Sequence, residues 1–189
     1  MRSIMSDSEG HRRIAAWFGT VALTVVVVAA PSRAMAQART ATPAPHCATP
    51  VYHQFDFFIG DWDTYDVTDS TKIVARNHVT RMVDGCAIRE VYEQGDGMSG
   101  ESFSTYDSSR HVWHQSWVTN RGELLLLEGG LRGANMVFTA KEKGSDGKSS
   151  LIRATWIPQH GSVRETAVRS TDGGKTWTPV FDIIFRPHR

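Results

Sequence analysis

Apolar and polar residues alternate along most of the chain, in short runs that Gly, Asn and Asp separate. A period of two is typical of a half-buried β-strand, and the separating residues are typical of tight turns. Only residues 52–59 have a pattern that fits a short helix or helical turn. The pattern predicts ten strands, at residues 62–67, 76–83, 87–92, 102–106, 112–119, 124–129, 136–141, 151–157, 163–170 and 177–185.

The connections between these strands are short, as at residues 120–122 and 144–147, so consecutive strands are expected to be antiparallel neighbours. Such a meander leaves two open sheet edges unless the first and last strands pair. We therefore predict one all-β domain at residues 51–189, a single antiparallel up-and-down β-barrel of about ten strands. A β-sandwich is the alternative, because strand spacing does not distinguish the two.

The first 36 residues differ in character from the rest of the chain. A basic segment at residues 11–13 precedes 17 uncharged residues at 14–30, and residues 34–36 are Ala-Met-Ala. This order is typical of a secretory signal peptide cleaved after Ala36, which predicts a periplasmic or secreted protein. A retained membrane anchor is the alternative, since 17 apolar residues are close to the length that crosses a bilayer.

Removal of residues 1–36 takes away four of the 21 basic and two of the 20 acidic side chains, which leaves a net charge of −1. The remaining 153 residues suit one domain. With so little net charge, neither nucleic acid nor a membrane is an expected partner after cleavage. Residues 37–50 are rich in Ala, Thr and Pro, which predicts a flexible leader arm.

Two cysteines, Cys47 and Cys86, follow the predicted cleavage site. In an exported protein an even number of cysteines is usually paired, because the compartment is oxidising. The disulfide would close a loop of about 39 residues, for which chain entropy gives roughly 3 to 4 kcal/mol of stabilisation. Two free thiols are the alternative.

Residues 170–177, STDGGKTW, have the S-x-D-x-G-x-T-W pattern of the Asp-box in sialidase-type propellers. A propeller needs at least four blades of about 40 residues, whereas this chain has one box and no repeat. The residues themselves suit a turn: Asp172 can accept hydrogen bonds from backbone amides, and Gly173 and Gly174 tolerate positive φ. We predict that the segment, with Trp177 packed over it, clasps the hairpin between the last two strands.

Three other motifs lack the context that their chemistry requires. GDGMSG at residues 95–100 fits G-x-G-x-x-G but opens no helix, so a loop is expected. His111 and His114 are three residues apart on a predicted strand and point to opposite faces. The four aspartates between residues 61 and 69 lack the glycine and distal glutamate of an EF-hand. No metal site is therefore expected.

The densest group of chemically versatile side chains lies at residues 111–130. On one strand face, Trp113, Gln115 and Trp117 can form a wall for an apolar or ring-shaped ligand, while His114 lies on the other face. Filling of the core by the same tryptophans is the alternative. The candidate ligand-binding residues are Trp113, His114, Gln115, Trp117, Arg153 and Arg164.

Polar side chains on later strands extend this candidate site. Arg153 shares a predicted strand with Trp156, and Arg164 shares the next with Glu165, so all can add to the interior. The alternative for Arg164 is a place in solvent, as for most arginines.

Three further residues form a candidate catalytic set. Glu90 and Glu128 adjoin apolar strand residues, where loss of hydration favours the neutral acid, so both are expected to have a raised pKa. With His114 they are the candidate acid and base of a cofactor-free isomerase or cyclase.

Four segments together resemble a family of exported bacterial domains of unknown function. The segments are 55–63 (FDFFIGDWD), 83–90 (VDGCAIRE), 113–130 (WHQSWVTNRGELLLLEGG) and 170–182 (STDGGKTWTPVFD). The resemblance covers nearly all of the mature domain and implies no reaction or cofactor. Phe58 stands where that family often has a tryptophan.

The tripeptide GDW at residues 60–62 resembles the G-x-W that opens the first strand of lipocalins, fatty-acid-binding proteins and other calycins. The resemblance implies a calycin-type barrel in which Trp62 closes one end. FFIGDW also resembles nitrobindin, a haem-binding barrel whose axial histidine lies late in the chain. The late histidines here, His160 and His188, lie in no such motif, so no cofactor is expected.

These observations predict an exported calycin-type barrel that binds a small, largely apolar molecule inside. A cavity of a few hundred Å³ lined by indoles would favour this function. The first alternative is an enzyme, which requires a carboxylate and His114 within hydrogen-bond reach in that cavity. The second is a filled barrel whose outer surface meets a protein partner. Residue patterns alone predict no oligomeric state.

Overall fold

The structure is a computed structural model that describes residues 46–144 and 146–189. The signal peptide expected at residues 1–36, and the leader arm up to residue 45, lie outside the described residues. Within the described ranges, ten strands and three 3-10 segments follow one another. No helix of this part of the chain is long and apolar enough to cross a membrane.

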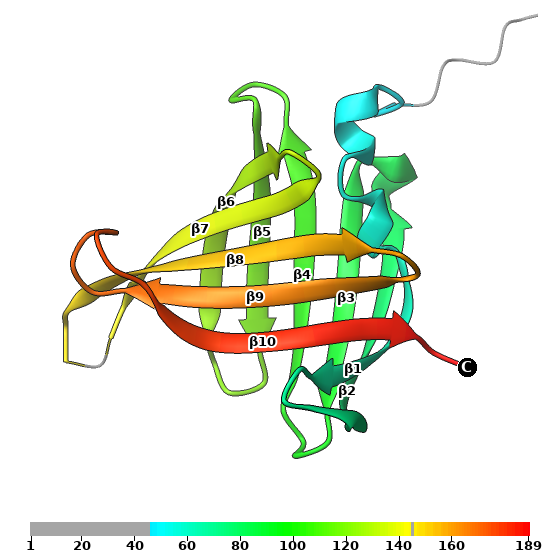
Figure 1. The fold of residues 1–189 in the computed structure, drawn as a ribbon. Helices are drawn as coiled ribbons and strands as arrows, with labels where there is room; N and C mark the ends of the chain where they lie inside the picture. Colours follow the sequence, from blue (N-terminus) through cyan, green and yellow to red (C-terminus); the bar gives the residue numbers. More distant parts are fainter. Residues whose placement is uncertain (1–45, 145) are drawn as a thin grey trace, which may run out of the picture. The chain divides into compact units, whose positions relative to one another are not determined.

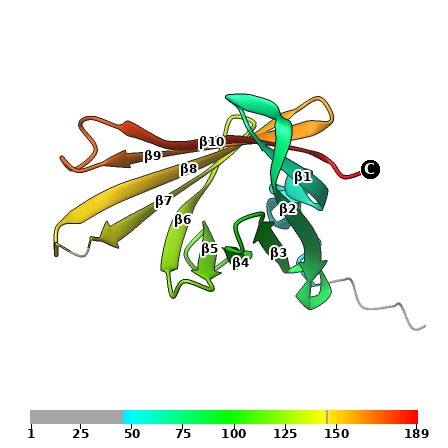
Figure 2. The same ribbon diagram turned by 90° about the horizontal axis from the view of Figure 1, so that it is seen from below.

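The ten strands form one closed antiparallel barrel (Figure 1). Each strand pairs with the next along the chain, and β1 pairs with β10, so the ring can be followed in Figure 2 from β2 through β9 to β10 and β1. The elements are η1 (Pro50–His53), η2 (Asp56–Phe58), β1 (Gly60–Asp66), β2 (Asp69–Met82), η3 (Val83–Gly85), β3 (Ala87–Gln94), β4 (Ser99–Asp107), β5 (Val112–Thr119), β6 (Leu124–Arg132), β7 (Asn135–Lys143), β8 (Ser149–Gln159), β9 (Ser162–Ser170) and β10 (Thr178–Pro187).

The predicted all-β up-and-down barrel is confirmed, and the sandwich is excluded because the β1–β10 pairing leaves the sheet no open edge. Each of the ten predicted strands overlaps an observed one. The largest boundary difference is at β2, which begins at Asp69 rather than at residue 76. Its first five residues are exposed and mostly polar, so they resemble a turn in sequence while they pair with β1.

Residues 50–58, which contain η1 and η2, form a segment that we call the plug. Two phenylalanines of the plug fill one end of the barrel. Phe55 and Phe58 are 0% and 1% exposed. The Phe55 ring lies 6.2 Å from the Trp113 ring and 5.4 Å from the Trp156 ring, both nearly edge to face. Trp62 Nε1 donates a hydrogen bond to the Phe58 carbonyl oxygen at 2.9 Å. We call this the closed end of the barrel; the predicted helical turn is confirmed there.

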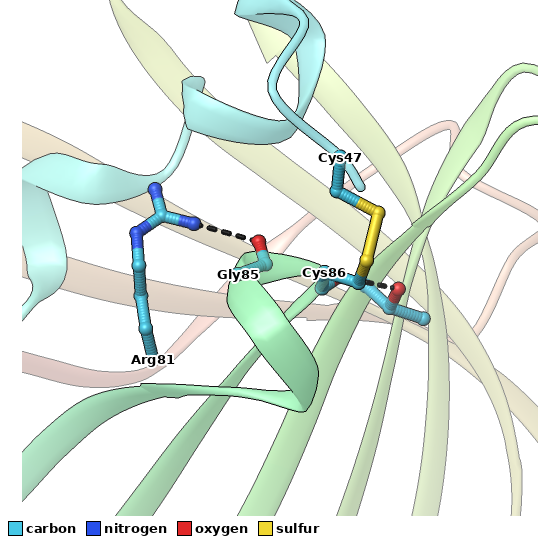
Figure 3. The surroundings of a disulfide bond; sticks show 5 residues. Cys47, Arg81, Gly85 and Cys86 are labelled. Atoms are coloured by element: carbon cyan, nitrogen blue, oxygen red, sulfur yellow. Dashed lines mark hydrogen bonds between the residues drawn. A yellow bond between two sulfur atoms is a disulfide. The ribbon is translucent and has the colours of Figure 1, made fainter. Parts of the chain in front are cut away.

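A disulfide ties the chain just before the plug to the barrel wall (Figure 3). Cys47 pairs with Cys86, which lies between η3 and β3. Around it, Arg81 Nη1 donates to the Gly85 carbonyl oxygen, and Thr105 Oγ1 donates to the Cys86 carbonyl oxygen, both at 2.8 Å. The predicted pairing is confirmed, and it anchors the plug segment covalently to the β2–β3 connection.

The Asp-box segment connects β9 to β10 as the predicted clasp. Asp172 Oδ1 accepts hydrogen bonds from the backbone amides of Lys175 at 3.0 Å and Thr176 at 2.9 Å. Thr176 Oγ1 also donates to Asp172 Oδ2, and these hydrogen bonds hold the pKa of the carboxyl group well below its ordinary value. Trp177 Nε1 donates to the Gly174 carbonyl oxygen at 3.0 Å. The Asp172 carboxylate, the Thr176 hydroxyl and the Trp177 indole are thus all used to close the turn.

The substitution Phe55→Ala should lower the free energy of unfolding by about 3 to 5 kcal/mol, because it removes a fully buried ring and leaves a cavity among the aromatic core residues. Urea unfolding followed by circular dichroism measures the loss. Phe103→Ala is the matched control, since this ring is 41% exposed on the outer face of β4 and should change stability by less than about 0.5 kcal/mol. Equal losses in both variants would contradict the role of Phe55.

Replacement of both cysteines by serine should lower the free energy of unfolding by about 3 to 4 kcal/mol, because the closed loop spans 39 residues. Thermal unfolding with and without a reductant measures this. The reductant should destabilise the natural protein by a similar amount and leave the double variant unchanged. A double variant as stable as the oxidised protein would show that the disulfide does not support the plug.

Candidate functional site

The other end of the barrel, which we call the cavity end, holds a cavity of about 460 Å³. Met98, Trp117 and Leu125 line it, and these residues lie at or beside the β3–β4 and β5–β6 turns. The wall is mostly apolar and includes Leu127, Ile152, Ala154, Trp156, Ala167 and Phe185. Residues 95–98 form the turn before β4 and residues 99–100 are its first two, so the predicted loop structure is confirmed for the first four residues of the segment 95–100.

Five adjacent strands, β1 to β5, place a row of hydrogen-bonded polar side chains inside the barrel, which we call the polar row. Thr64 Oγ1 donates to Asn77 Oδ1 at 2.9 Å, and Asn77 Nδ2 donates to Glu90 Oε1 at 2.5 Å. From the other side, Ser102 Oγ donates to Glu90 Oε2 at 2.9 Å, and Gln115 Nε2 donates to Ser102 Oγ at 3.3 Å. All five side chains are buried, so the row is shielded from bulk water.

Glu90 lies at the centre of the polar row and at the surface of the cavity. Burial raises its pKa to about 7, while the hydrogen bonds from Ser102 and Asn77 partly oppose this rise. The carboxyl group therefore changes charge close to neutral pH. The raised pKa expected for Glu90 from the sequence is confirmed.

A second carboxyl group, that of Glu165 on β9, also lines the cavity. Glu165 is 9% exposed, and no hydrogen bond or ion pair from the described residues reaches its carboxyl group. Burial, and then repulsion from Glu90, raise its pKa well above the ordinary value. Burial and the charges of Glu165 and Glu90 likewise raise the pKa of Tyr92, another lining residue, to about 12.

The predicted wall residues on β5 divide between the two ends of the barrel. Gln115 and Trp117 line the cavity, whereas Trp113 lies in the filled closed end, where its Nε1 donates to Gln54 Oε1 at 3.0 Å. The expectation that Trp113 lines the ligand wall is therefore wrong. Residues 113 and 117 share a face, but four residues of strand separate them by about 13 Å along the barrel.

His114 and Glu128 lie on the outer face of the barrel rather than in the cavity. His114 Nδ1 is 3.5 Å from Glu128 Oε1, and Arg110 Nη1 donates to the same oxygen at 2.7 Å. The hydrogen bond from Arg110 is the main reason that the pKa of Glu128 is lowered, so the expected rise is wrong. His114 also cannot converge with Glu90 inside the cavity, because alternate residues of β5 face opposite sides of the wall.

The two candidate arginines also face outwards. The Arg153 guanidinium carbon lies 4.1 Å from the centre of the Trp177 ring. Arg164 donates from Nε and Nη2 to the two carboxylate oxygens of Asp182, at 2.8 and 2.5 Å. The expected interior role of the two arginines is therefore wrong, because alternate residues of a strand face opposite sides of the barrel wall. The neighbours that do line the cavity are Trp156 and Glu165, which are register partners across β8 and β9.

The remaining histidines that drew attention in the sequence are also outside the cavity. His111 lies in the turn before β5 rather than on the strand, and His160 lies in the β8–β9 turn. His188 Nδ1 is 3.0 Å from Asp63 Oδ1 near the end of β10. Within residues 46–144 and 146–189, no three His, Cys, Asp or Glu side chains are grouped so as to hold a metal ion.

No protein-family model matches the chain, and no curated protein matches it. The resemblance to exported domains of unknown function stays a prediction from the motifs.

Between about pH 4.5 and pH 7 the folded protein should lose stability as the pH rises, because Glu90 binds its proton more tightly in the folded than in the unfolded state. The shift from 4.5 to about 7 corresponds to about 3 kcal/mol. Glu165→Gln removes a second group that titrates in the same direction. The variant should therefore unfold at a higher urea concentration than the natural protein at about pH 8, and at nearly the same concentration at about pH 5.

Glu101→Gln is the matched control for this measurement. Glu101 lies on the outer wall, and Arg89 holds its pKa below the ordinary value with hydrogen bonds of 2.8 Å. Its replacement should give no gain in stability at about pH 8, because the ionised form is the favoured one. An equal gain in both variants would show that burial of Glu165 is not the cause.

Proposed function

We propose that the protein is an exported calycin-type β-barrel that binds a small, largely apolar molecule in its cavity end. The observation that carries the proposal is the uneven filling of the barrel. The plug and the aromatic core fill the closed end, whereas about 460 Å³ remains at the cavity end. Small-molecule pockets usually measure about 300 to 1,000 Å³ and combine apolar walls with a few polar groups.

The composition of the wall supports a ligand rather than trapped solvent. Trp117, Leu125 and Ile152 supply apolar surface, and Trp156 supplies a second indole. Water makes few hydrogen bonds with such apolar walls. An apolar molecule that displaces this water is therefore favoured by about 25 cal/mol per Å² of buried apolar surface. A filled barrel that acts only through its outer surface has no need of this volume.

Export is part of the same proposal. Residues 1–36 have the order of a secretory signal peptide, and the disulfide between Cys47 and Cys86 suits an oxidising compartment. A binding barrel with a stapled plug is suited to a periplasmic or extracellular environment, where disulfides persist.

A second candidate function is a cofactor-free isomerase or cyclase. The observation in its favour is a carboxyl group, Glu90, whose pKa of about 7 suits general acid–base catalysis near neutral pH. Its partner group in the cavity would be Glu165, because His114 lies on the outer face. Turnover of a bound molecule distinguishes this candidate from simple binding.

Leu125→Trp should weaken binding of the uncharged apolar dye N-phenyl-1-naphthylamine by about tenfold or more, because the larger side chain occupies cavity volume. Dye fluorescence during titration of the purified protein measures the affinity. Leu126→Trp is the matched control: Leu126 follows directly on β6 but is 53% exposed on the outer face, so the dye affinity should change less than about twofold.

Two further results bear on the proposal. Native mass spectrometry of protein purified from the periplasm of its own cells should reveal a co-purified small molecule. Failure of the natural protein to bind the dye, or equal affinities for the two tryptophan variants, would contradict binding in the cavity.

A further inference from the structure

The charge of the cavity has one sign. Every ionisable side chain that lines it is acidic, namely Asp66, Glu90, Tyr92 and Glu165, and among the described residues no Lys, Arg or His lines it. The raised pKa of Tyr92 reflects the charges of Glu165 and Glu90 in addition to burial. An anionic ligand would be repelled there, whereas a cation would offset two buried carboxylates.

Among the buried hydrogen-bonding groups at the cavity surface, acceptors without a donor predominate, whereas the half-buried Gln94 accepts from Tyr92 Oη at 3.2 Å and keeps amide N–H donors. Glu165 has no donor from the described residues, although it is more than nine-tenths buried. The Ser102 hydroxyl gives its proton to Glu90, so Gln115 must donate its amide N–H to Ser102, and no described donor reaches Gln115 Oε1. The Trp156 indole N–H has no acceptor within residues 46–144 and 146–189, but it is buried within the wall. The buried part of the cavity surface, at Glu165 and Gln115, therefore presents acceptors that need donors.

We propose that the ligand is a small organic cation, an ammonium group on an apolar, ring-bearing body. This inference rests on the proposed function and specifies the ligand class. An ammonium group carries three donors and no acceptor, which matches the free oxygens of Glu165 and Gln115. The ring lies against Trp117 and Leu125, toward the β5–β6 turn. Tyr92 and Trp117, with ring centres 5.9 Å apart, add aromatic faces that attract a cation.

The proposal predicts a pH dependence of binding. The ammonium group favours the ionised carboxylates, so binding displaces a proton wherever Glu90 or Glu165 is still protonated in the free protein. Affinity for the cation therefore rises as the pH increases from about 5 to about 8. A neutral ligand of the same shape lacks this dependence, because it has no preference for the ionised form.

A series of probes of matched shape tests the ligand class on the purified protein. The probes are 2-phenylethylammonium, 2-phenylethanol, propylbenzene and 3-phenylpropanoate, which place a cation, a hydroxyl, a methyl and a carboxylate beyond the same ring. Displacement of the neutral dye, or calorimetry, measures each affinity at about pH 5 and about pH 8. The cation should bind about tenfold or more tightly than the other three at about pH 8, and this preference should fall severalfold at about pH 5.

Two variants separate charge recognition from cavity shape. Glu165→Gln keeps the size of the side chain and should abolish most of the preference for the cation, while propylbenzene affinity changes less than about twofold. Glu101→Gln, on the outer wall, should leave both affinities unchanged. The pH series on the natural protein needs no variant, so it tests the proposal even where a substitution disturbs folding.

The outcomes are distinguishable. Propylbenzene or 2-phenylethanol binding as tightly as the cation at about pH 8 overturns the inference and leaves the proposed function intact. The tightest binding by 3-phenylpropanoate does the same. Absence of binding by all four probes and by the dye overturns the proposed function together with the inference.

Discussion

The pairing of β1 with β10 is the constraint on which both the core and the cavity depend. It joins residues 62–66 to residues 183–187 in antiparallel register and removes the last open edge of the sheet. An open sheet would expose the inward faces of its strands to water. Because the ring is closed, Glu90 on β3 and Glu165 on β9 share one low-dielectric interior, where burial raises the pKa of both and the charge of Glu90 raises that of Glu165 further. The chemistry of the site is therefore a consequence of topology.

Closure defines a tube, and the distribution of side-chain volume then decides which part of it is hollow. At the closed end, the plug residues Phe55 and Phe58 meet large rings such as those of Phe138 and Trp156. Toward the cavity end, β8 and β9 present the small residues Ala154 and Ala167 to the interior. The barrel thus has one densely packed half that supplies stability and one half whose empty volume contributes none.

The sequence predicts the fold better than the site because the two depend on different information. Alternation, turn residues and the need to pair the sheet edges are local or topological, and they sufficed for the ten strands and the Asp172 clasp. The even cysteine count in a chain with a predicted export signal sufficed for the disulfide. Side chains alternate between the two faces of a strand, and this rule already separates His114 from Gln115. The same rule could have excluded Arg153 from the interior, because Arg153 is three residues from the buried Trp156 on the same strand. The alternation rule could not separate Trp113 from Trp117, because both lie on the same face. Only the tertiary contact between the plug and Trp113 distinguishes the filled end from the cavity end. An interior place for Glu165 is among the predictions, but its burial without a partner from the described residues depends on contacts between strands that are distant in the sequence.

The contrast between the two buried glutamates bears most directly on function. Glu90 has donors from Asn77 and Ser102, so its burial can be explained by a structural network of the kind that cores often contain. Glu165 has no such partner in the part of the chain that the structure describes, and a carboxyl group buried without one destabilises the folded state at neutral pH. An apolar residue at this position would fill the same wall without that cost. In the function proposed here, the partner of this unpartnered acid is a group that arrives with the ligand.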